Sequence, residues 1–190
     1  AVYTKIVNKD ISYINKKFEI EKIISFKGIK KGIENTNYLL RSKNKKFILT
    51  IFEKRVLKKE IPFFMKLMDQ LSDLDINCPK PLKNKNGKFL IKLKNKTACI
   101  VTFLNGKDKK KLNYKNCYEI GKAIAQMHLS TKKINLYRGN SMGVVKLKPL
   151  LNKIKFKSRD FKNLEKFLKT NFQDIKKKWP KKLPKGIIHG

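Results

Sequence analysis

The apolar residues in the first hundred positions alternate with polar residues or form short continuous runs. Glycine, asparagine and proline separate these runs, as they commonly do between strands. Asn86-Gly87, for example, is a strong turn signal ahead of a strand. The pattern predicts five strands, the first of them reached through a bend, at residues 18–29, 36–41, 47–52, 88–93 and 97–104.

Helices are marked by a different period, in which apolar residues recur every three or four positions. This spacing predicts a helix over residues 61–71, with Pro62 in its first turn, where a missing N–H is tolerated. Two further helices are expected around residues 117–128 and 161–179, and Pro180 ends the second of these. A short polar helix is expected at residues 10–17.

These elements divide the chain into two parts with different secondary structure. Residues 1–105 contain the strands and one amphipathic helix, whereas residues 106–190 are mainly helical. We therefore predict an α+β fold, with a β-rich N-terminal lobe over 1–105 and a helical lobe over 106–190. A length of 190 residues is sufficient for two small lobes.

The net charge of +34 raises the question of nucleic-acid binding. Only four of the 48 basic residues are arginine, however, which is a residue commonly used to contact base edges. The lysines are also spread along the whole chain rather than gathered in one tract. We interpret them as a solvated basic surface and do not expect nucleic acid as the main partner.

Composition also bears on the cellular compartment. No apolar stretch approaches the roughly 20 residues needed to cross a bilayer, and the first residues resemble no signal peptide. Cys78, Cys99 and Cys117 are an odd number without metal-ligand spacing. We expect reduced, unreactive cysteines, no membrane partner, no metal site in this chain and a cytoplasmic location.

The segment between the first two predicted strands is the first candidate for chemistry. Gly28 and Gly32 lie there, and Asn35, Thr36 and Asn37 follow. Glycine allows a backbone to approach a phosphate closely, and exposed N–H groups can donate to it. The spacing is not that of a G-x-G-x-x-G motif, and a glycine-containing hairpin without a ligand explains the segment equally well.

Three other positions are candidates. Thr50 stands where the third strand of protein kinases carries a lysine for the ATP phosphates, although it could be an ordinary half-buried threonine. The end of strand 97–104 could offer backbone groups to an adenine, or be a plain sheet edge. His189 follows a short apolar run, where a kinase catalytic loop would begin. His128 is expected to be a core residue.

Several segments together resemble the bacterial homoserine kinases of the aminoglycoside-phosphotransferase-like group. The sequence Gly-Ile-Glu-Asn-Thr-Asn-Tyr at residues 32–38 is the most specific of them, whereas the final His-Gly is typical of the wider group. The resemblance extends over essentially the whole chain. It is carried by residues 1–4, 25–29, 32–38, 47–55, 62–64, 76–79, 121–128 and 186–190.

The resemblance implies a protein-kinase-like bilobal fold with an antiparallel sheet in the N-terminal lobe. It implies transfer of the γ-phosphoryl group of ATP, with Mg²⁺, to the hydroxyl of L-homoserine in threonine biosynthesis. His189 would begin the catalytic loop, whose Asp would lie beyond Gly190, so we expect a truncated and inactive fragment. The implied nucleotide-binding residues are Gly28, Gly32, Asn35, Thr36, Asn37, Thr50 and, at the hinge, Val101, Thr102, Phe103 and Leu104.

One departure from the general kinase pattern leaves a role open. Because Thr50 replaces the lysine, another cation would have to meet the phosphates, and Lys27, Lys30 and Arg55 are candidates. Glu60 lies near the position of that lysine's helix partner but could be a surface residue. Two alternative functions also remain open: a related kinase acting on choline, an aminoglycoside or methylthioribose, and a basic binding module without catalysis.

Overall fold

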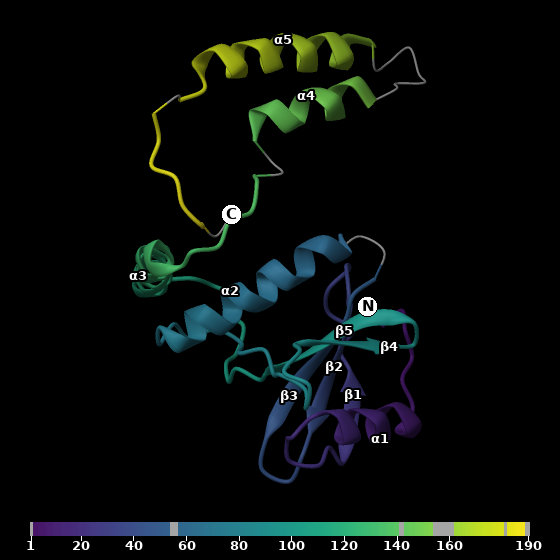
Figure 1. Cartoon of the computed structure of the whole chain (residues 1–190). Coiled ribbons are helices and arrows are strands. Elements are labelled where there is room, and N and C mark those ends of the chain that lie inside the picture. Colours follow the sequence, from purple (N-terminus) through teal and green to yellow (C-terminus); the bar gives the residue numbers. More distant parts are fainter. Residues whose placement is uncertain (1, 54–56, 141–142, 154–161, 181, 189–190) are drawn as a thin grey trace. The chain divides into compact units, whose positions relative to one another are not determined.

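The computed structural model describes residues 2–53, 57–140, 143–153, 162–180 and 182–188. It divides into two compact units, which we describe separately (Figure 1). The first comprises residues 1–136 and 187–190, and the second comprises residues 137–186. The predicted division into lobes between residues 105 and 106 stays a prediction.

The first unit contains a five-stranded antiparallel sheet with the strand order β1-β2-β3-β5-β4 (Figure 1). Only β3 and β5 are neighbours that are not joined by a hairpin, and helix α2 lies in the connection between them. The number of strands and their antiparallel pairing agree with the prediction. The strands are β1 (Ser25–Gly28), β2 (Thr36–Arg41), β3 (Lys46–Ile51), β4 (Leu90–Leu93) and β5 (Lys96–Thr102).

Short polar turns set the register of two hairpins. Between β2 and β3, the N–H of Ser42 donates to the carbonyl of Lys45 at 2.9 Å. Between β4 and β5, Lys94 and Asn95 both have positive φ, at 49° and 60°. Two consecutive left-handed residues form the turn type whose twist matches that of a hairpin, and asparagine tolerates this conformation well.

The first strand is shorter than predicted, because the chain before it is held by a side chain instead of a neighbouring strand. The amide of Asn15 accepts a hydrogen bond from the N–H of Ile23 at 2.9 Å and donates to its carbonyl at 3.1 Å. Phe18 and Ile23 are buried in the core from this irregular segment. Their apolar character therefore reflects burial, not strand pairing.

Helices cover the two faces of the sheet. Alternate residues of β3 point to opposite sides, so that Leu49 packs on one face and Ile48 on the other. Helix α1 (Asn8–Lys17) contributes Ile11 and Ile14 to the first of these cores. Helix α2 (Ile61–Asp73), which follows the short 3₁₀ helix η1 (Lys58–Glu60), contributes Ile61 and Met65 to the second.

The remaining helices lie in the second half of the chain. In the first unit, α3 (Tyr114–Ser130) is capped by the side chain of Asn113, which accepts a hydrogen bond from the N–H of Asn116 at 2.9 Å, and it continues into η2 (Thr131–Lys133). The second unit contains α4 (Val144–Lys153) and α5 (Lys162–Lys178). Helix α4 was not predicted, since Pro149 lies inside it. None of the described helices is long and apolar enough to cross a membrane.

Candidate functional site

The strand register brings two of the predicted site residues together. Asn37 on β2 is paired with Thr50 on β3, and the Thr50 hydroxyl donates to the Asn37 side-chain oxygen at 2.8 Å. Thr50 lies on the face that also carries Ile48 and Phe52, as its position in the strand predicted. The same register puts Lys27 of β1 on this face, because Lys27 is paired with Leu39 and Leu39 with Ile48.

The residue next to Thr50 on the neighbouring strand β5 is a cysteine. Cys99 on β5 is paired with Thr50 and is buried under α2. Burial raises the pKa of its thiol to about 12, so the thiol is protonated at neutral pH. Since the thiolate is the reactive form, Cys99 is a packing residue here, in agreement with the expectation of an unreactive cysteine.

The turn between β1 and β2 presents exposed backbone donors. Gly32 has a φ of 95°, a conformation that glycine adopts without strain, and no atom beyond its two chain neighbours lies within 4 Å of the position of an added Cβ. The N–H groups of Lys31, Ile33 and Glu34 donate to no atom of the described residues. An exposed turn with N–H groups of this kind fits an anionic ligand such as a phosphate.

Gly28, by contrast, has a packing reason to be glycine. A Cβ added there would lie 2.9 Å from Cγ2 of Val2, which is closer than real Cβ contacts. The N-terminal segment therefore packs directly on the last residue of β1. This contact explains Gly28 without a ligand, whereas the sequence prediction explains it by the approach of a phosphate.

A double substitution separates these two explanations. Gly28→Ala is expected to destabilise the protein by about 1–2 kcal/mol, because the new methyl group meets Val2. Val2→Ala in the same protein should restore most of the loss by removing Cγ2. The measurement is urea denaturation of both variants and of Val2→Ala alone. Full recovery of stability in the double variant would assign the glycine to packing against Val2, and incomplete recovery would contradict that assignment.

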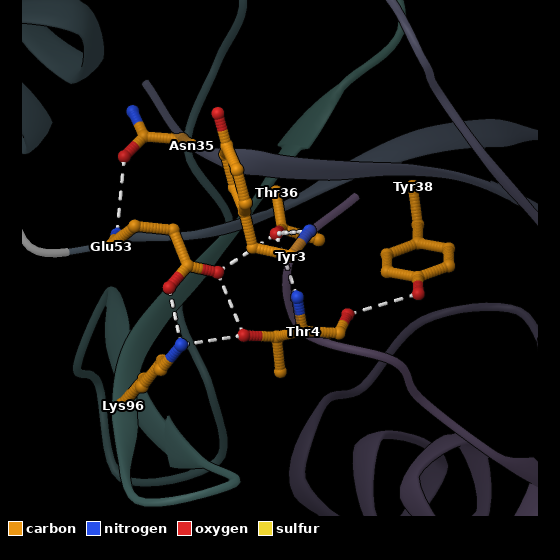
Figure 2. Close-up of polar contacts among 7 residues, drawn as sticks. All are labelled: Tyr3, Thr4, Asn35, Thr36, Tyr38, Glu53 and Lys96. Carbon is orange, nitrogen blue, oxygen red and sulfur yellow. Dashed lines mark hydrogen bonds and ion pairs between the residues drawn. The ribbon is translucent and has the colours of Figure 1, made fainter. Parts of the chain in front are cut away.

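Glu53, two residues beyond the end of β3, is the centre of a polar network (Figure 2). Its side chain is 10% exposed. One carboxylate oxygen accepts hydrogen bonds from the hydroxyls of Thr4 at 2.7 Å and Thr36 at 2.8 Å. The other forms an ion pair with the ammonium group of Lys96, which also donates to the Thr4 hydroxyl at 2.7 Å. We refer to Thr4, Thr36, Glu53 and Lys96 as the Glu53 network.

The hydrogen bonds of the Glu53 network determine its charge state. Burial alone would raise the pKa of Glu53, but the hydrogen bonds from Lys96, Thr4 and Thr36 outweigh it, and the pKa is lowered. Glu53 is therefore a carboxylate at neutral pH, surrounded by donors. A charged and fully engaged carboxylate of this kind is suited to hold segments together rather than to exchange protons.

The network ties the N-terminal segment to the start of β2, at Thr36, and to the residues after β3, at Glu53. Thr36 is fully buried, and its oxygen accepts hydrogen bonds from the N–H groups of Tyr3 at 2.9 Å and Thr4 at 3.1 Å (Figure 2). The backbone N–H of Glu53 donates to the side-chain oxygen of Asn35 at 3.3 Å. The hydroxyl of Thr36 is thus engaged within the protein, and its predicted contact with a nucleotide stays a prediction.

The predicted hinge residues follow β5 to its end. The N–H of Thr102 donates to the carbonyl of Lys80, and that of Phe103 donates to the carbonyl of Lys46. Val101 is buried, and Leu104 is exposed beyond the strand. Within the described part of the chain, the N–H of Leu104 donates to no atom. A donor for an adenine edge is therefore available at Leu104, one residue after the last backbone pairing.

Two predicted candidates cannot be placed, since His189 and Arg55 lie outside the described residues. No group of three His, Cys, Asp or Glu side chains among the described residues could hold a metal ion.

The sequence did not predict the role of Glu53 and Lys96. Its one available signal was a carboxylate directly after a buried strand, in a chain with only 14 acidic residues.

Comparison with known proteins agrees with this architecture. A profile of the family described as "Phosphotransferase enzyme family" matches residues 25–190. Homoserine kinase from Paramagnetospirillum magneticum is 36% identical over 190 residues, which are 100% of this chain and 58% of that protein. Homoserine kinase from Agrobacterium fabrum is also 36% identical, over 100% of this chain and 59% of that protein. The chain thus spans less than two thirds of the curated relatives it matches.

Solved structures resemble the chain as well. Spectinomycin phosphotransferase in complex with ADP and spectinomycin superposes with a TM-score of 0.54 and 15% identity, covering 92% of this chain and 56% of that one. An aminoglycoside phosphotransferase from Alicyclobacillus acidocaldarius gives a TM-score of 0.56 at 7% identity, covering 93% and 52%. At these identities the likeness shows the fold, and it confirms the predicted protein-kinase-like architecture. Because the family profile covers most of the chain, the chain belongs to the phosphotransferase enzyme family.

Proposed function

We propose that this chain is the nucleotide-covering part of a kinase that transfers the γ-phosphoryl group of ATP to the hydroxyl of L-homoserine. The product, O-phospho-L-homoserine, would serve threonine biosynthesis. The observation that carries the proposal is the match of all 190 residues to curated proteins named homoserine kinase, at 35–36% identity. The likeness to aminoglycoside phosphotransferases is much weaker in sequence and supports the fold alone.

The geometry of the described residues is compatible with ATP. The turn between β1 and β2 offers N–H donors to the phosphates, and Leu104 offers one to the adenine edge. Asn37 follows this turn by two residues and is paired with Thr50, and their linked side chains would border the phosphates. Lys27 lies on the same face and is our choice among the cations that could replace the missing lysine.

The metal would complement these residues. When bound, Mg²⁺ would supply positive charge to the phosphate groups. We assign it no ligand among the described residues. The part of the reaction proposed for this chain is therefore positioning of the nucleotide, which is a major component of phosphoryl-transfer catalysis.

Phosphoryl transfer to L-homoserine by the complete gene product tests the proposal. We expect ATP-dependent formation of O-phospho-L-homoserine, detected by mass spectrometry. L-2-aminobutyrate is the matched control, because it lacks only the acceptor hydroxyl and should yield no phosphorylated product. Turnover of choline or spectinomycin in place of homoserine would contradict the substrate but preserve the kinase. No transfer to any of these hydroxyl compounds would contradict both.

A further inference from the structure

The N-terminal segment contacts the turn between β1 and β2 at a point beyond the Glu53 network. The hydroxyl of Tyr3 donates to the carbonyl of Ile33 at 2.9 Å, across 30 positions of sequence. Val2 packs on Gly28 at the start of the same turn. The N–H of Tyr3 is itself fixed by Thr36 (Figure 2). Tyr3 is therefore anchored at its backbone and reaches the turn with its side chain.

This hydrogen bond determines the direction of a backbone donor. The carbonyl of Ile33 and the N–H of Glu34 belong to one planar trans peptide unit and point in opposite directions. When Tyr3 holds the carbonyl, it also orients the N–H of Glu34 away from itself. That N–H is one of the donors that have no acceptor among the described residues. Tyr3 thus orients a group suited to an anion.

The two ends of the turn are fixed by hydrogen bonds that do not involve the hydroxyl of Tyr3. At the first end, the N–H of Ile29 donates to the carbonyl of Asn37 at 2.8 Å. At the second, Asn35 and Thr36 are bound by Glu53. Between these ends the residues are exposed and form neither helix nor strand. A loop of this kind loses conformational freedom when it closes on a ligand, and a bond that orders it beforehand improves affinity.

We propose that Tyr3 is a positioning residue for the nucleotide phosphates, acting through the carbonyl of Ile33 on the turn of residues 29–35. The inference rests on the proposed function, since it assumes that this turn covers the phosphates of ATP. Tyr3 itself is not expected to touch the nucleotide. Its effect should therefore be confined to ligands that carry phosphates and should disappear for adenosine alone.

Tyr3→Phe in the complete gene product tests this inference, because the change removes only the hydroxyl. We expect the dissociation constant for a non-hydrolysable ATP analogue to rise about fivefold, which corresponds to one hydrogen bond of ordinary strength. The dissociation constant for adenosine should not change. Calorimetry gives the first constant, and ligand-observed NMR gives the second. The melting temperature of the free protein should stay close to that of the unaltered protein.

Tyr118→Phe is the matched control. Tyr118 lies on α3 and is 59% exposed, compared with 57% for Tyr3, so the two changes are made at tyrosines of nearly equal exposure. Binding of the ATP analogue should be unaffected in this variant. An unchanged constant in Tyr3→Phe, while the unaltered protein binds the analogue, would overturn the inference and leave the proposed function standing. An equal loss for adenosine would also overturn it. An unaltered protein that does not bind the analogue would refute the proposed function itself.

Discussion

Glu53→Ala is expected to lower the free energy of unfolding by about 3 kcal/mol, because it removes the buried acceptor of two hydroxyls. The hydroxyls of Thr4 and Thr36 would lose their charged partner inside the protein. Lys96 is 39% exposed and can recover water, so its share of the loss is smaller. Urea denaturation followed by circular dichroism measures the change. Glu19→Ala, at an exposed glutamate, should change the stability by less than about 0.5 kcal/mol.

The pH dependence of stability provides a second test of the role of Glu53. Since the pKa of Glu53 is lowered in the folded protein from its ordinary value of 4.5, the stability it contributes is fully present above that value. It is lost as the pH falls below 4.5 towards the folded-state pKa. The difference in stability between the unaltered protein and Glu53→Gln should therefore shrink over this interval. A difference that stays constant with pH, or a loss as large in Glu19→Ala, would contradict the role assigned to Glu53.

The sheet could be predicted to a large extent because its signals are local. β2 was predicted at residues 36–41 and is observed over Thr36–Arg41, since alternating residues and polar turns mark both of its ends. The start of β1 could not be placed, because burial of Phe18 and Ile23 in an irregular segment produces the same apolar residues as a strand. Helix α4 was missed because a proline inside a helix resembles a boundary in the sequence.

The candidate site could be predicted only where its residues are neighbours in one motif or face. The pairing of Asn37 with Thr50 follows from two adjacent strands. The Glu53 network could not be derived in this way, because its hydrogen bonds join residues 17, 43, 49 and 92 positions apart. Periodicity identifies which residues are buried, but not which distant polar group each buried oxygen meets. The resemblance marked residues 1–4 as distinctive without giving a physical role for them, and the structure supplies one.

Thr36→Val is expected to destabilise the protein by about 2–3 kcal/mol, because it replaces one buried oxygen and leaves two backbone N–H groups without their acceptor. The side chains have nearly the same shape, so packing should change little. Thr36→Ser is the matched control, since serine keeps the oxygen and lacks only the methyl group. Its loss should be about 1 kcal/mol, the value of one buried methyl group. Urea denaturation of both variants measures these differences.

Amide hydrogen exchange shows whether the loss of stability arises at the N-terminal segment, as predicted. In Thr36→Val, the amide protons of Tyr3 and Thr4 should exchange faster than in Thr36→Ser, because the oxygen that accepts them is gone. Protection at the centre of β3, such as at Leu49, should change only by the amount of the global destabilisation. If the two variants lost the same stability, the Thr36 oxygen would not anchor the N-terminal segment. The turn between β1 and β2 would then have to be ordered without the N-terminal segment.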